Sequence, residues 1–374
     1  MSLNLSTRLT VLLGCRYPIV QTAMGWVANP RLVAATCNAG GFGFLAGATI
    51  EPARMEAAIL ETRRLTAQPF GVNFHMYQPN AEQIVELVLR HAVRAVSYSR
   101  SPGRRMIARL KEAGVVCMPT VGALRHARKA VEMGADVVTV QGGEGGGHTG
   151  SVPTALLLAQ VLAAVDVPVV AAGGFSDGHG LLAALAQGAE GIAMGTRFLM
   201  SRESPVPGAT LERYLAACDP ARVVVSRAID GLPQRMIRNE LLDLLEGAGT
   251  WRRLRLRLAL ALACVQAYRR HSGMGLGQML QALRQRGELS LVQALMAANA
   301  PMVIQKAMVE GRPAEGVLPA GQVVALIDSL PGCAELIEGI VIQAETRLVE
   351  LAARLGADAE HSAAEESRHA TISR

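Results

Sequence analysis

The stretch ADVVTVQGGEGGGHTG (residues 135–150) decides the fold class, because an apolar run leads straight into a loop made largely of glycine. The first six residues have the composition of a buried β-strand, and the loop holds six glycines, Glu144 and His148. Glycine lets a backbone adopt positive φ and approach a flat or anionic ligand closely, and histidine exchanges a proton near neutral pH. The stretch predicts a strand that ends beside a planar, phosphate-bearing cofactor and a base. A glycine-rich turn with a surface histidine is the alternative interpretation.

Two more glycine loops follow, AAGGFSDG (residues 171–178) and MGTRF (residues 194–198). Each comes after a strand-like run and before helix-forming sequence. Glycine turns after two consecutive strands are typical of the phosphate site of a (β/α)8 barrel, where backbone N–H groups hold the phosphate. Neither loop fits GxGxxG or the P-loop pattern, which disfavours a Rossmann or NTPase fold.

Eight apolar, β-branched or glycine-bounded runs lie before residue 200, and helix-forming stretches separate them. Continuous apolar strands that alternate with helices indicate a parallel sheet covered on both faces, so we predict an α/β fold, a (β/α)8 TIM barrel. The runs begin near Pro18, Gly41, Pro69, Ala95, Val115, Val137, Val167 and Gly191. Active sites of this fold lie at the C-terminal ends of the strands. The residues that fall there are Met24, Asn73, His75, His148, Gly173 and Thr196.

The rest of the chain predicts further units. The barrel is expected over residues 1–210, followed by a mostly helical cap over residues 211–315 with helices at 239–246, 251–271, 274–286 and 290–308. Residues 316–355 are expected to return to the barrel as C-terminal helices. Residues 356–374 are polar without periodicity, so a disordered tail is expected there.

Composition excludes several classes of protein. Aromatic residues make up 3% of the chain, too few for stacking platforms that bind single-stranded nucleic acid. Much of the net charge of +6 lies in residues 251–257 (WRRLRLR) and 268–271 (YRRH). These arginines form either the solvated face of an amphipathic helix or a site for an anionic ligand such as the phosphates of coenzyme A. The apolar run beside them is too short to span a bilayer.

Cysteine usage and the N-terminus indicate a cytoplasmic protein without metal. The six cysteines are scattered, with no CxxC and no Cys/His pair at metal-ligand spacing. The N-terminus lacks the apolar core of a signal peptide. A homo-oligomer is compatible with the sequence.

Several motifs, in order along residues 6–350, resemble the nitronate monooxygenase superfamily, formerly called 2-nitropropane dioxygenases. They are PIVQTAMGWVANPRLVAATCNAGGFGFLAG (residues 18–47), GVNFH (71–75), QGGEGGGHTG, AAGGFSDG, MGTRF and GQVVALI (321–327). The resemblance implies a TIM barrel that binds FMN without covalent attachment.

The same resemblance implies roles for single residues. His148 matches the family's catalytic histidine. The positions implied to contact the flavin ring, the ribityl chain or the phosphate are Ala23, Met24, Gly25, Asn73, Gln141, Gly145, Gly146, Ala172, Gly173, Gly174, Gly195 and Thr196.

A narrower resemblance concerns the substrate. MGWVA (residues 24–28), LMAANAPMVIQKAMVEG (295–311) and VLPAGQVVALIDSLPGCAELIEGI (317–340) are similar to the flavin oxidoreductases of bacterial steroid C/D-ring degradation, which act on coenzyme A thioesters. Nitronate oxidisers of the family carry an aromatic–His–aromatic–Gly stretch at the fourth strand, where this chain reads VSYSRSPG (96–103). That departure disfavours nitronate oxidation.

The expected function is therefore an FMN-dependent oxidoreductase that introduces or reduces a C=C bond in an alicyclic acyl-CoA. His148 would take a proton from the carbon acid beside the thioester, and the flavin would carry out the redox step. The alternatives are a nitronate monooxygenase, an NAD(P)H:quinone-type flavin reductase and a non-catalytic FMN-binding barrel. NAD(P)H or another electron partner remains open.

Four further residues are candidates for substrate contacts, each with a structural alternative. His75 follows Asn73 and either points into the flavin site or packs elsewhere. The others are Tyr98 and Arg100 at the end of the fourth strand, and Asn299, which either reaches the mouth from the cap or caps a helix. Glu144 either orients His148, binds substrate or plays a structural role in its loop.

Overall fold

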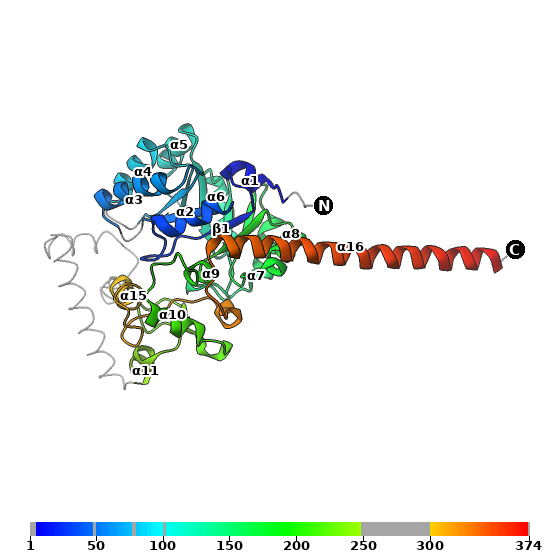
Figure 1. Cartoon of the computed structure of the whole chain (residues 1–374). Coiled ribbons are helices and arrows are strands. Elements are labelled where there is room, and N and C mark those ends of the chain that lie inside the picture. The colour runs from blue at the N-terminus through cyan, green and yellow to red at the C-terminus, as the bar shows by residue number, and fades with distance from the viewer. Residues whose placement is uncertain (1–4, 48–49, 77–79, 100–101, 248–299, 373–374) are drawn as a thin grey trace.

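Eight parallel strands close into a barrel in the computed structural model, which describes residues 5–47, 50–76, 80–99, 102–247 and 300–372. The last barrel strand pairs with the first, through Val20 opposite Ala193, so the barrel has no open edge. This confirms the predicted TIM barrel. The strands are β1 Ile19–Gln21, β2 Phe42–Ala46, β3 Gly71–His75, β4 Ala95–Ser99, β5 Val116–Val121, β6 Val138–Gln141, β8 Val169–Ala172 and β9 Gly191–Met194 (Figure 1).

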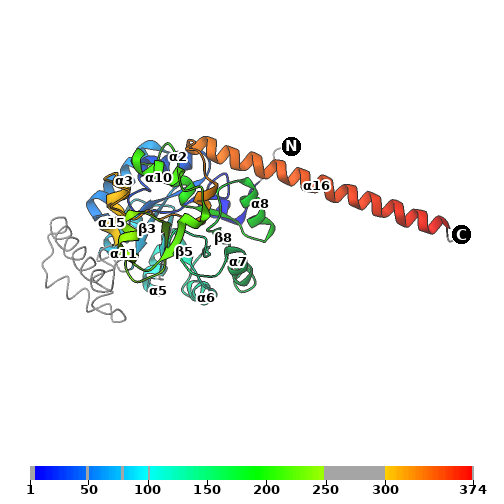
Figure 2. The same cartoon turned by 90° about the horizontal axis from the view of Figure 1, so that it is seen from below.

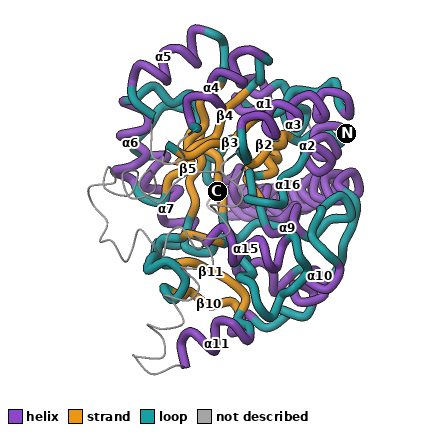
Figure 3. The backbone as a smooth tube through the Cα atoms, turned by 90° about the vertical axis from the view of Figure 1, so that its left-hand side faces the viewer, coloured by secondary structure: helices purple, strands orange, loops and turns teal. Residues whose placement is uncertain are grey.

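Helices surround the barrel on its outside, as Figure 3 shows. Side-chain caps set where some of them begin: Asn29 accepts a hydrogen bond from Leu32 N at 3.0 Å, and Asp177 accepts one from Gly180 N at 2.9 Å. The helices are α1 Arg8–Leu13, α2 Pro30–Asn38, α3 Pro52–Leu65, α4 Ala81–Arg90, α5 Arg104–Glu112, α6 Leu124–Glu132, α7 Thr154–Leu162, α8 Gly178–Ala186 and α9 Thr196–Leu199. Those from α2 to α8 match the predicted helix-forming stretches between the strands, whereas α1 was not predicted.

Successive side chains along each strand point to opposite faces, so the core has one layer inside the barrel and one between the barrel and the outer helices. Phe42 and Phe44 fill the barrel interior, with their ring centroids 5.1 Å apart, and Leu9 and Leu13 of α1 pack with them. The intervening residues, such as Val96, pack outward against the helices. Because side chains alternate with a period of two, odd-numbered residues of β3 and β4 face inward and even-numbered ones face outward.

A small antiparallel sheet lies beside the barrel. The hairpin of β10 (Val223–Ser226) and β11 (Gln234–Ile237) pairs with β7 (Gly147–His148), a two-residue strand inside the glycine loop. Figure 3 shows the hairpin next to α11. The sequence did not predict this sheet. The other elements described here are α10 Gly208–Leu215, η1 Pro220–Arg222, α11 Glu240–Gly247 and α15 Ala300–Met308, and most of the predicted cap helices lie outside the described residues.

The C-terminal part contains a short 3-10 helix, η2 (Gln322–Leu326), and one long helix, α16 (Cys333–Ile372). Gly178 lies so close to α16 that a Cβ on it would stand 2.3 Å from Ile340 O. Beyond this contact α16 projects away from the barrel (Figure 2). The sequence predicted a disordered tail from residue 356, and the structure has helix as far as Ile372. The tail is rich in Ala and Glu, which favour helix, and extending a helix already begun on the barrel requires no new nucleation.

No helix of the described residues is both long enough and apolar enough to cross a membrane.

Candidate active site

The glycine loop after β6 is held at the C-terminal end of the barrel by its own residues and by the hairpin. Gln141, the last residue of β6, donates a hydrogen bond from Nε2 to the backbone oxygen of His148 at 3.0 Å. On the other side, His148 pairs with Gln234 in the register of β7 and β11. Two separate contacts therefore fix the backbone of His148.

The side chain of His148 meets a buried carboxylate. Its Nε2 lies 2.7 Å from Asp230 Oδ2, and the side chain of His148 is 57% exposed whereas that of Asp230 is 2% exposed. Gln234 Nε2 donates to the same oxygen at 2.6 Å, and Leu232 N donates to Asp230 Oδ1 at 3.0 Å. Burial opposes ionisation of Asp230, but these hydrogen bonds outweigh it and lower the pKa of the carboxyl below its ordinary value. The site thus pairs an accessible imidazole with a buried, ionised carboxylate.

Asp230 and Gln234 are functional candidates that the sequence analysis missed. Asp230 lies 82 residues from His148 along the chain, in the turn between β10 and β11. No motif surrounds it, and the segment was assigned to a helical cap. Only the pairing of β11 with β7 brings the two side chains together.

The predicted phosphate loops present backbone rather than side chains. Gly173 and Gly174 both have positive φ, +94° and +90°. A Cβ on Gly146 would lie 2.7 Å from the backbone of Ala320 and Gly321, so this position has no room for a side chain. A Cβ on Gly174 would meet only the side chain of Glu144, at 3.6 Å. Gly146 therefore serves the packing of its loop against the chain at Ala320, whereas Gly173 and Gly174 provide a backbone cradle of the kind that a phosphate-bearing cofactor needs.

The loops after β1 and β9 lie against this cradle. A Cβ on Gly195 would stand 3.1 Å from Thr22 Oγ1 and 3.5 Å from Met24 Sδ. Thr196 Oγ1 accepts a hydrogen bond from Gly321 N at 2.9 Å, and its own hydroxyl hydrogen stays available to a ligand. In the loop after β1, Ala23 and Met24 are half-buried and Gly25 is exposed. The predicted cofactor residues on these strands are therefore brought together at one end of the barrel.

Glu144 has a structural role in this arrangement. Its carboxylate accepts hydrogen bonds from Thr154 N at 2.9 Å and from Thr154 Oγ1 at 2.7 Å, at the start of α7. Arg235 donates to the neighbouring Gly143 O at 3.0 Å, and its charge interacts with Glu144. The carboxylate thus ties the glycine loop to α7, and of the alternatives left open for Glu144 the structural one fits.

A polar row lines the inner face of β3 and β4. Asn73 Nδ2 donates to Ser97 O and Oγ, both at 3.1 Å, and His75 Nδ1 lies 2.7 Å from Ser99 Oγ. Burial, and the nearby charge of His148, lower the pKa of His75 below its ordinary value. Ser97 and Ser99 were not predicted, although the alternation in AVSYS places both on the inner face.

Tyr98 does not belong to this row, and its prediction as a substrate contact is wrong. It is 1% exposed, and its ring packs 5.7 Å from Phe74 in the layer between the barrel and the outer helices. The period of two along β4 gives the reason, because neighbours of an inward-facing serine must face outward. Arg100, Asn299 and the basic stretch of residues 251–271 lie outside the described residues.

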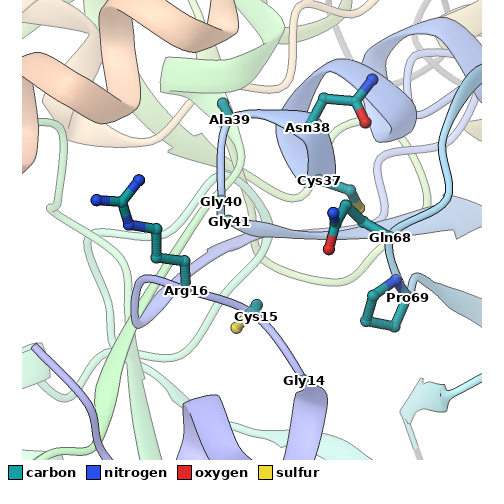
Figure 4. Close-up of a pocket in the computed structure, with 10 residues that line it drawn as sticks. All are labelled: Gly14, Cys15, Arg16, Cys37, Asn38, Ala39, Gly40, Gly41, Gln68 and Pro69. Carbon is teal, nitrogen blue, oxygen red and sulfur yellow. The ribbon is translucent and has the colours of Figure 1, made fainter.

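A cavity of about 250 Å³ lies at the opposite end of the barrel, where β1, β2 and β3 begin (Figure 4). Its lining includes Cys15, Arg16, Cys37, Asn38 and Gln68. Burial raises the pKa of Cys15 and of Cys37 to about 12, so both thiols stay protonated. Within the described residues, no group of three or more His, Cys, Asp or Glu side chains could hold a metal ion. Because its lining residues precede β1, β2 and β3 and the predicted site residues lie at the C-terminal ends of the strands, the cavity is separate from the candidate active site.

Comparison with known proteins places the chain among flavin enzymes of one family. A family model described as nitronate monooxygenase matches residues 6–87 and 78–343. A protein of Rhodococcus jostii (strain RHA1), named (3aS,4S,5R,7aS)-5-hydroxy-7a-methyl-1-oxo-octahydro-1H-indene-4-carboxyl-CoA dehydrogenase, is 48% identical over 94% of this chain and 99% of its own length. A protein of the same name from Mycobacterium tuberculosis (strain ATCC 25618 / H37Rv) is 48% identical over 92% of this chain and 98% of its own. Among solved structures, FabK from Thermotoga maritima matches with a TM-score of 0.75 at 31% identity, covering 93% of this chain and 99% of that one.

Proposed function

Because the chain belongs to the nitronate monooxygenase family, we propose that it is an FMN-dependent dehydrogenase that introduces a C=C bond into an alicyclic acyl-CoA. The chain is an oxidoreductase of that family, and the family implies a flavin. One observation of the structure carries the proposal. His148 presents a 57% exposed imidazole, backed by a buried carboxylate, beside the backbone cradle at the C-terminal end of the barrel. The names of the two relatives that are 48% identical to this chain supply the substrate class.

FMN is the flavin that fits the loops. Gly173 and Gly174 follow β8, and Gly195 and Thr196 follow β9, so two adjacent strand ends would hold a single phosphate, which is what FMN carries. Residues of the loops after β1 and β6, among them Met24 and Gly145, would hold the flavin ring. A bound flavin supplies the two-electron oxidation that no side chain of the protein can carry out.

The protein's own contribution is a base in a fixed position. A carbon–hydrogen bond beside a thioester carbonyl is weakly acidic, and a neutral imidazole can take its proton near pH 7. His148 is exposed enough to reach a substrate, and the ionised Asp230 stabilises the imidazolium that results. On the inner face of β3, His75 would contact the substrate, and Asn73, held by its hydrogen bond to Ser97, would contact the flavin.

The free cysteines bear on the cellular compartment, and the redox chemistry bears on the electron partner. The described cysteines Cys15, Cys37, Cys117, Cys218 and Cys333 are all free thiols, which fits a reducing cytoplasm, where coenzyme A thioesters are turned over. Dehydrogenation of the substrate releases two electrons, so turnover would need an electron acceptor, with NAD+ or another soluble carrier as candidates.

The test compares three substrate classes on the FMN-loaded protein. The proposal expects a bicyclic acyl-CoA, incubated with an artificial electron acceptor, to yield a product lighter by two hydrogens in mass spectrometry. Propionate nitronate with oxygen, and NADH with a quinone, should give far slower turnover. Rapid nitronate oxidation without acyl-CoA turnover would replace the proposal with nitronate monooxygenase, and fast quinone reduction alone would replace it with a quinone reductase.

A further inference from the structure

We propose that Asp230 is a positioning residue that holds the neutral His148 with its proton on Nε2, so that Nδ1 is the atom that takes the substrate proton. The inference rests on the proposed function, because it names the reacting atom of the base assigned there. It concerns a residue of the β10–β11 hairpin, which is not part of the barrel.

The hydrogen bonds determine which nitrogen carries the proton. An ionised carboxylate only accepts hydrogen bonds, and Asp230 Oδ2 lies 2.7 Å from His148 Nε2, so Nε2 must be the donor in this contact. Gln234 Nε2 stands 3.2 Å from His148 Nε2 because both nitrogens donate to the same oxygen. With Nε2 occupied in this way, the lone pair of the neutral ring is on Nδ1.

Asp230 is built into the hairpin so that its carboxylate cannot easily turn away. Its Oδ1 accepts from Leu232 N, and the turn is closed by a hydrogen bond from Gly231 N to Arg227 O at 3.1 Å. Next to it, Ile229 is buried in the small core under the hairpin. A second link, from Thr149 N to Pro233 O at 3.2 Å, joins the turn to the residue after His148. The carboxylate and the imidazole are therefore fixed to one another through backbone on both sides.

This geometry serves proton abstraction from a carbon acid. When Nδ1 takes the proton, the ring becomes positively charged, and a buried carboxylate already in contact with Nε2 stabilises that charge without rearrangement. His75 is another titratable group that interacts with His148, and because burial lowers its pKa it adds no positive charge near neutral pH. Asp230 is thus the charged group that contacts the ring while it takes the proton.

A purely structural role for Asp230 would need only the contact to Leu232 N, so the test must separate the two roles. The probe is the FMN-loaded protein labelled with 15N in its histidines, whose two ring nitrogens report the tautomer by NMR. His148→Gln identifies the His148 signals among the eight histidines. The wild-type protein is expected to show the Nε2–H tautomer at His148. A dominant Nδ1–H tautomer there would overturn the proposal directly.

Asp230→Asn replaces the carboxylate with an amide of nearly the same shape, so it removes one hydrogen-bond acceptor and the negative charge. Asparagine has one acceptor oxygen where aspartate has two, so it cannot satisfy Leu232 N and the donors at Oδ2 together. We expect the His148 tautomer to lose its preference for Nε2–H. Asp219→Asn is the matched control, because Asp219 also accepts from a backbone N–H, that of Ala221 at 2.9 Å, but is exposed and contacts no histidine. An unchanged tautomer in Asp230→Asn would contradict the proposal.

Kinetics gives the second arm of the test. For the acyl-CoA reaction, Asp230→Asn should lower kcat about 10- to 100-fold, a share of the usual contribution of a general base, with KM within about twofold. Asp230→Glu should recover part of kcat, since it restores a carboxylate. A rise in KM without a fall in kcat, or an equal fall in kcat in Asp219→Asn, would overturn the positioning role.

If no acyl-CoA is turned over by the wild type, the proposed function fails, and the NMR measurement still decides the tautomer. If Asp230→Asn does not fold, the wild-type tautomer and Asp230→Glu carry the test.

Discussion

The two ends of the barrel are made by the same eight strands but carry different chemistry. At the C-terminal end, His148 is exposed and paired with a buried carboxylate, and Gly173 and Gly174 present backbone with positive φ. At the N-terminal end, the cavity beside Cys15 and Cys37 contains thiols that burial keeps protonated. The difference teaches that a cavity does not by itself mark the reactive end of the barrel, since in this fold one end serves reaction and the other stability.

Removing the base should have the largest effect. We expect His148→Ala to retain FMN but to lower kcat for the acyl-CoA roughly 100-fold or more, because a general base usually contributes that much. The side chain touches neither phosphate loop in the structure, so flavin binding should be unaffected. Steady-state kinetics and the flavin content of the purified variant check this. Turnover close to that of the wild type would remove His148 from the mechanism.

A matched pair of glycines compares the two ends directly. Gly174 has φ +90° and lies after β8, and Gly188 has φ +100° and lies before β9 at the opposite end. Added Cβ atoms would meet neighbours at 3.6 and 3.7 Å, so alanine should strain both backbones by a similar ~1–2 kcal/mol. Only Gly174→Ala should also weaken FMN binding, by about tenfold or ~1.4 kcal/mol. Titration of the apoproteins with FMN measures this, and equal affinities would show that the cradle is not where the flavin binds.

Protonation of His75 should reduce stability in mild acid. Its pKa in the folded protein is lowered from 6.5, so the unfolded chain binds the proton more readily, and the free energy of unfolding decreases as pH falls below about 6.5. Stability from this group is present above that pH and is lost below it. His75→Gln should flatten this part of the profile of Tm against pH. Identical slopes in variant and wild type would show that His75 is not held in its neutral form.

The smallest effect is expected at the N-terminal end. The guanidinium of Arg16 lies 4.8 Å from the ring centroid of Tyr17, an exposed contact worth about 0.5–1 kcal/mol. Arg16→Ala should lower Tm slightly and leave kcat and KM for the acyl-CoA unchanged. A clear loss of turnover would mean that the cavity beside Arg16 contributes to the reaction, and the contrast between the two ends would fail.

The sequence allowed the barrel and its glycine loops to be predicted because buried parallel strands are continuous apolar runs with sharp ends. It could not reveal β7, which is two residues long, or its pairing with β11, since a short strand has no periodicity to detect. Asp230 was missed for the same reason, because tertiary pairing alone brings it to His148. Tyr98 was mispredicted for a different reason. It lies near the end of a strand, where substrate contacts are expected, but the period of two in AVSYS directs its side chain outward, away from the site.

The central claim is that the C-terminal end of the barrel oxidises an acyl-CoA with His148 as the base. Mixing the FMN-loaded protein with a bicyclic acyl-CoA in the absence of oxygen, while following the visible absorbance of the flavin, tests it most directly. The account predicts rapid loss of the oxidised flavin spectrum in the wild type, and a rate that is lower by roughly 100-fold or more in His148→Ala. An unchanged spectrum in the wild type, or equal rates in the two proteins, would contradict the claim.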